Sequence, residues 1–144
     1  MNFEGDSGAY LLYSYARACS VLRKAGSNKP KTVDVYDSDE LEPQEFALVK
    51  KLSQFPEVFF NSYKTLNPSL IANYSYQLSQ IFSEFYHSCP ILNSKQNAFR
   101  ISLTEAFKQV LGNCLNLLGI EILDATKNIS AFDPKNTKFT LQSA

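Results

Sequence analysis

Apolar side chains recur at three- and four-residue spacing in five stretches of this chain, the pattern of an amphipathic helix. Prolines and glycines mark where these stretches begin and end. The predicted helices run from about Ala9 to Ala25, from Pro43, from Pro56, from Asn67-Pro68 to about Ser88, and from about Lys95 to Leu118. Each helix has one apolar face and most connections are short. We therefore expect an all-α fold, an antiparallel bundle of about five helices.

The apolar faces define the expected core. Long stripes run from Ile71 to Phe85 and from Leu103 to Leu118. The shorter second and third helices offer stripes of Phe46, Val49 and Leu52, and of Val58, Phe59 and Tyr63. Gly26 and Gly119 follow the first and last helices where a C-terminal glycine belongs, so each is expected to end its helix.

The last part of the chain has a different character. The stretches 129–132 and 137–141 flank Asp133-Pro-Lys-Asn136, a good type I turn sequence. This segment can form a small C-terminal β-hairpin or a loose tail. We accordingly divide the chain into a helical domain over residues 1–121 and a C-terminal extension over residues 122–144.

The 144 residues carry 14 basic and 14 acidic side chains, so the formal net charge is zero. A nucleic-acid-binding protein usually has a basic excess, which counts against one here. The charges are nevertheless segregated: all charged side chains in residues 17–31 are basic, and all those in residues 34–45 are acidic. Two interpretations of this pattern remain: a basic patch on one face of the protein, or ordinary clustering of charges on a solvated surface. The acids are expected to be solvated.

Cysteine usage and hydropathy point to the cytoplasm. The three cysteines are an odd number without CxxC spacing, which argues against a disulfide framework or a zinc site. No apolar run is long enough to span a bilayer, and the first residues lack the pattern of a signal peptide. We therefore expect a cytoplasmic protein with no membrane partner and no metal site.

Catalytic motifs are missing from the sequence: no P-loop, GxGxxG, HExxH or GxSxG is present. The single histidine, His87, lies two residues from Cys89, and side chains at that spacing on a helix do not face each other. No catalytic residue is therefore expected. Tyrosine is abundant instead, and its ring can stack on an exposed base while its hydroxyl finds a polar partner.

Four blocks of sequence, in order, carry a family resemblance. They are FEGDSGAYLLYSYARACSVLRKA, LSQFPEVFFNSY, NPSLIANYSYQLSQIFSEFYHSCPIL and RISLTEAFKQVLGNCLNLLGI. Together they resemble the C-terminal anticodon-binding domain of arginyl-tRNA synthetase, the DALR-type domain. The resemblance covers about Phe3 to Glu121. Beyond it, Thr126 stands about where the family has a terminal methionine that contacts the anticodon loop, and the DALR signature itself is not present.

The resemblance implies a tRNA-binding module that recognises the anticodon arm of arginine tRNA. It implies that Tyr86 lies against the unstacked anticodon loop, and that Ser14 and Arg17 contact the same loop. Tyr10 and Tyr13 match a stretch near the domain junction that reaches the anticodon arm. No cofactor is expected in this domain.

The resemblance also implies an enzyme, the class I arginine–tRNA ligase, whose ATP, Mg²⁺ and arginine bind on a catalytic domain. The motifs of that domain are absent here, so the chain is expected to be one piece of a longer protein, with the catalytic domain of the same enzyme as its partner. Two alternatives remain open. One is a stand-alone adaptor that recruits arginine tRNA to another enzyme, and the other is a helical protein-interaction domain. DNA is not an expected partner.

Overall fold

The computed structural model describes residues 6–26 and 41–122 and places them in five α-helices. The helices are α1 (Asp6–Ala25), α2 (Pro43–Ser53), α3 (Phe55–Thr65), α4 (Ser69–Ser88) and α5 (Asn97–Leu117). No strand occurs in these two ranges. The all-α prediction is confirmed. The hairpin predicted around Asp133–Asn136 and the extension over residues 122–144 lie almost wholly outside the described residues.

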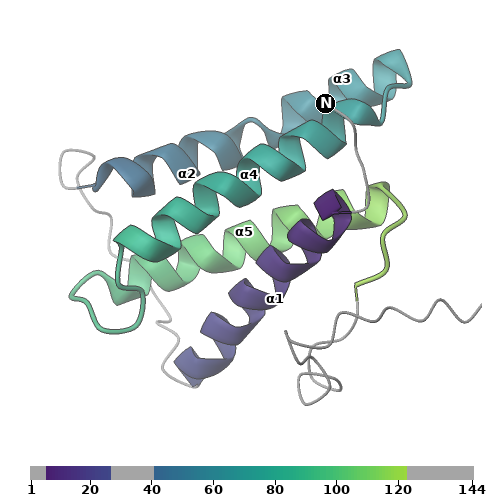
Figure 1. The fold of residues 1–144 in the computed structure, drawn as a ribbon. Helices are drawn as coiled ribbons and strands as arrows, with labels where there is room; N and C mark the ends of the chain where they lie inside the picture. Colours follow the sequence, from purple (N-terminus) through teal and green to yellow (C-terminus); the bar gives the residue numbers. More distant parts are fainter. Residues whose placement is uncertain (1–5, 27–40, 123–144) are drawn as a thin grey trace, which may run out of the picture.

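The helices form an antiparallel bundle with α4 and α5 at its centre (Figure 1). The helices α2 and α3 follow one another along α4, while α1 packs obliquely against α4 and α5. The central contact is a parallel stack of Phe82 on α4 and Phe107 on α5, with ring centroids 3.8 Å apart and an interplanar angle of 5°. Both rings are buried and fix the spacing of the two long helices.

Helix ends follow the signals in the sequence. Gly26 has φ of 55° and Gly119 has φ of 71°, the left-handed conformation that glycine adopts without strain. Pro43 occupies the first turn of α2, where its missing N–H is not needed. Pro56 likewise lies in the first turn of α3 and separates it from α2.

The predicted apolar stripes of α2 and α3 are wrong in part. Phe46 is 56% exposed, and Val49, Phe59 and Tyr63 are also exposed. In α2 the buried side chains are Glu45 and Leu48 instead, so the helix is turned relative to the expected orientation. The stripes predicted for α4 and most of α5 are confirmed.

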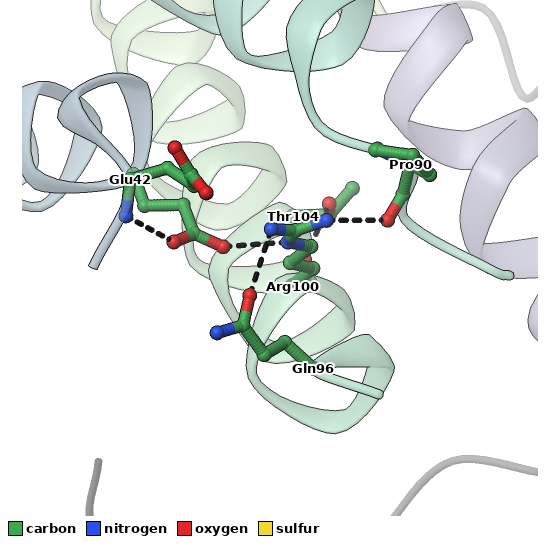
Figure 2. A network of polar contacts seen from close by, with 6 residues as sticks. Glu42, Pro90, Gln96, Arg100 and Thr104 are labelled. Atoms are coloured by element: carbon green, nitrogen blue, oxygen red, sulfur yellow. Dashed lines mark hydrogen bonds and ion pairs between the residues drawn. The ribbon is translucent and has the colours of Figure 1, made fainter. Parts of the chain in front are cut away.

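A buried ion pair explains the orientation of α2. Arg100 of α5 donates from Nε to Glu45 at 2.5 Å, from Nη1 to the Pro90 carbonyl at 2.9 Å and from Nη2 to Gln96 Oε1 at 2.8 Å (Figure 2). Glu45 also accepts the Glu42 backbone N–H at 2.8 Å, within a capping box at the start of α2. The expectation that the acidic segment is solvated is therefore wrong for Glu45, because its carboxylate has a cationic partner in the core.

Candidate nucleic-acid interface

A cluster of two tyrosines and an arginine joins α1 to α4. Tyr13 and Arg17 lie one turn apart on α1, and Arg17 Nη2 donates a hydrogen bond to Tyr13 Oη at 2.6 Å. The guanidinium carbon of Arg17 lies 4.7 Å from the ring centroid of Tyr13 and 4.7 Å from that of Tyr86 on α4. The structure therefore brings together three residues that were predicted to face the anticodon arm.

The Tyr86 ring lies near the C-terminal end of α4 and is 37% exposed. One turn earlier on α4 the buried Phe82 ring lies 6.4 Å away, tilted by 39°. The next residue, His87, meets the Tyr86 ring edge-on at 5.5 Å. Tyr86 thus lies beside the buried Phe82 ring and is partly exposed to solvent.

A second aromatic pair lies further toward the N-terminal ends of the same two helices. Tyr10 of α1 and Tyr76 of α4 have ring centroids 5.3 Å apart, tilted by 51°. Tyr76 and Tyr86 are ten residues apart in sequence, which is about 15 Å along a helix. The aromatic surface therefore extends beyond the Arg17 cluster. Tyr76 was one of many tyrosines in the sequence, and no spacing rule identified it as the partner of Tyr10.

Ser14 differs from the other predicted site residues, because it is buried between the helices with 4% of its surface exposed. Burial raises the pKa of the Tyr10 hydroxyl, and the nearby Tyr76 raises it further, while Arg17 and a hydrogen bond with Ser14 oppose the rise. The buried Ser14 side chain thus holds the Tyr10 hydroxyl through this hydrogen bond. Its position favours an indirect role over a direct contact with a nucleic acid.

No ion pair of Arg17 with a carboxylate is found within the described ranges. Its hydrogen bond there goes to the neutral Tyr13 hydroxyl, whereas Arg100 is paired with Glu45. Cations over aromatic faces keep their charge while gaining about 0.5–1 kcal/mol at exposed sites. Arg17 therefore holds a positive charge available to an anion.

Other candidate chemistry is sparse in this part of the chain. His87 is exposed, whereas Cys89 is buried. Across residues 6–26 and 41–122, no three histidine, cysteine, aspartate or glutamate side chains are grouped so that they could hold a metal ion. None of the helices there has an apolar stretch long enough to cross a bilayer.

Comparison with known proteins places the chain in a family. A family model for the DALR anticodon binding domain matches residues 11–125, which include all five helices except the first residues of α1. The chain belongs to the DALR anticodon-binding domain family. Within this DALR domain, the matched range contains four of the five predicted site residues: Tyr13, Ser14, Arg17 and Tyr86.

Named relatives of this DALR domain are synthetases. It is 38% identical over 128 residues to an arginine–tRNA ligase of Thermococcus sibiricus, covering 84% of this chain and 20% of the relative. It is 37% identical over 127 residues to the arginine–tRNA ligase of Clostridium botulinum, covering 86% of this chain and 22% of the relative. The chain thus spans about a fifth of the length of the curated relatives it matches.

Solved structures show the same bundle. The arginyl-tRNA synthetase of Thermus thermophilus superposes with a TM-score of 0.72 at 30% identity, over 85% of this chain and 21% of that one. A second structure, described as a putative arginyl-tRNA synthetase from Campylobacter jejuni, superposes with a TM-score of 0.67 at 22% identity and shows the fold alone.

Proposed function

We propose that this chain is the module of an arginine–tRNA ligase that binds the anticodon arm of arginine tRNA. The observation that carries the proposal is the cluster of Tyr13, Arg17 and Tyr86, in a member of the anticodon-binding family. The cluster supplies partly exposed aromatic rings and a cation without a carboxylate partner in the described ranges. These are the groups that hold unstacked bases and phosphates.

Within this proposal, Tyr86 stacks on a base of the anticodon loop and Arg17 contacts a phosphate or base edge. Arginine codons are CGN and AGR, so their anticodons share only the middle base, a cytosine. A module that serves the whole arginine set must read that cytosine and tolerate variation at the two other positions. We assign the stacking role to Tyr86, with Tyr10 and Tyr13 extending the surface along α1.

The remaining steps of aminoacylation belong to other parts of the proposed enzyme. ATP, Mg²⁺ and arginine bind on a catalytic domain, which is the protein partner of this module, and the enzyme works in the cytoplasm. Because the chain has zero net charge, it lacks most of the favourable counterion release on binding RNA. We expect the 144-residue chain alone to bind tRNA weakly, with Kd on the order of 10⁻⁵ M or higher.

The test is a titration of the 144-residue chain with an anticodon stem-loop of arginine tRNA, followed by NMR. Losing one base stack costs ~1–3 kcal/mol, so Tyr86→Ala should weaken binding roughly five- to 150-fold. Tyr86→Phe should have little effect, since stacking needs the ring and not the hydroxyl.

A stem-loop whose middle anticodon base is changed serves as the control. If Tyr86→Ala weakens binding of that stem-loop as much as binding of the normal one, Tyr86 does not read the middle base. A wild-type chain that binds both stem-loops and an unrelated one equally would contradict the proposed function as a whole.

A further inference from the structure

The position of Arg17 has a consequence for how a base could reach Tyr86. The guanidinium lies over the Tyr86 ring and over the Tyr13 ring at the same centroid distance, 4.7 Å. The rings of Phe82 and His87 are further neighbours, with centroids 6.4 Å and 5.5 Å from that of Tyr86. The guanidinium therefore lies against one face of the Tyr86 ring in the free protein, while 37% of the residue stays exposed.

We propose that Arg17 is a positioning residue that covers the stacking face of Tyr86 until RNA displaces it, and that the Tyr13 hydroxyl is the latch that holds it there. This inference rests on the proposed function and adds a step to it. The incoming base takes the place of the guanidinium on Tyr86. The displaced Arg17 keeps its charge, forms no ion pair with a carboxylate of the described ranges, and is free to meet a phosphate.

The relative strengths of the contacts allow this exchange. A cation–π contact at an exposed site changes an equilibrium constant about two- to fivefold. Base stacking on an aromatic side chain is stronger, about five- to 150-fold. A base therefore displaces the guanidinium, but RNA binding is weakened by whatever holds Arg17 in place. That includes the 2.6 Å hydrogen bond to Tyr13 Oη.

Tyr13→Phe tests the latch because it removes only the acceptor oxygen and keeps both rings and the charge of Arg17. We expect the variant chain to bind the anticodon stem-loop about two- to fivefold more tightly than wild type, the size of one weak polar or cation–π contact. Tyr63→Phe is the matched control, since Tyr63 is 73% exposed on α3. It should leave the affinity unchanged.

NMR of the wild-type chain gives a second readout that a merely structural role would not move. In the free protein the side-chain resonances of Arg17 should be shifted upfield by the two rings, and this shift should largely disappear when the stem-loop saturates the chain. The inference is overturned if Tyr13→Phe binds as wild type or more weakly, or if the upfield shift persists in the complex.

Tyr86→Ala separates this inference from the proposed function. If Tyr86→Ala binds the stem-loop as well as wild type, the stacking role itself fails. If Tyr86→Ala weakens binding and Tyr13→Phe weakens it too, the stacking role stands and the latch alone is wrong.

Discussion

Replacing Glu45 by alanine should be among the most destabilising single substitutions in this chain. The Glu45 side chain is fully buried, with 0% of its surface exposed, and Arg100 is almost as buried. Without Glu45 the guanidinium keeps only two neutral acceptors, the Pro90 carbonyl and Gln96 Oε1. An uncompensated cation then remains in the core.

The expected loss is about 3–5 kcal/mol in the free energy of unfolding, the range for removing one partner of a buried ion pair. Glu45→Gln should cost less. Its amide has one oxygen, whereas the carboxylate accepts from both Arg100 Nε and the Glu42 N–H. One of these donors loses its acceptor, and Arg100 again lacks a countercharge, so the cost should lie between about 1–3 kcal/mol for one unsatisfied buried group and the loss expected for Glu45→Ala. The double variant Glu45→Leu with Arg100→Met should lose less stability than Glu45→Leu alone or Arg100→Met alone, because no buried charge remains in it.

Urea denaturation followed by helical circular dichroism measures these free energies. Glu121→Ala is the control, because this glutamate is exposed beyond α5 and its loss should change stability by less than about 0.5 kcal/mol. A loss below about 1 kcal/mol for Glu45→Ala would refute the reasoning. So would a double variant as unstable as the sum of the two single ones.

Three further predictions concern the core. Phe107→Ala removes half of the central ring stack and should lower the free energy of unfolding by about 3–5 kcal/mol. Phe46→Ala, on the exposed face of α2, should lower it by less than about 0.5 kcal/mol. Equal losses would contradict the orientation of α2. Burial raises the pKa of Tyr74, so the stability it contributes is fully present below about pH 10 and is lost as the pH rises further. Tyr74→Phe should therefore show a shallower fall in stability above that pH, and an unchanged fall would count against the burial. Cys19 is only half-buried while Cys114 is fully buried, so peptide mapping should find Cys19 alkylated first in the native chain; prior reaction at Cys114 would contradict the packing.

The helices and their ends could be predicted because their signals are local. Pro43 begins α2, and Gly26 and Gly119 adopt the left-handed conformation after α1 and α5. The long α4 and α5 each carry an apolar stripe over several turns, so their buried faces were unambiguous. Such signals need no knowledge of what the helix packs against.

The orientation of α2 could not be predicted, because a distant residue decides it. The helix has only 11 residues and carries apolar side chains on two sides. Its hydropathy favours burying Phe46, but Arg100 lies on the core face of α5 and needs a buried carboxylate. One signal was present in the sequence: Arg100 falls in register with Leu103 and Phe107 on the apolar stripe of α5.

The two arginines explain why the candidate site was harder to foresee than the core. Arg100 donates to three acceptors and is paired with a carboxylate, so its charge is neutralised within the core. Arg17 has a phenol hydroxyl and two aromatic faces as neighbours, which hold the guanidinium in place and leave its charge unneutralised by any carboxylate of the described ranges. The resemblance to the family nominated Arg17 and Tyr86 separately. Their contact depends on how α1 crosses α4, and this crossing places the Arg17 guanidinium against the Tyr86 ring.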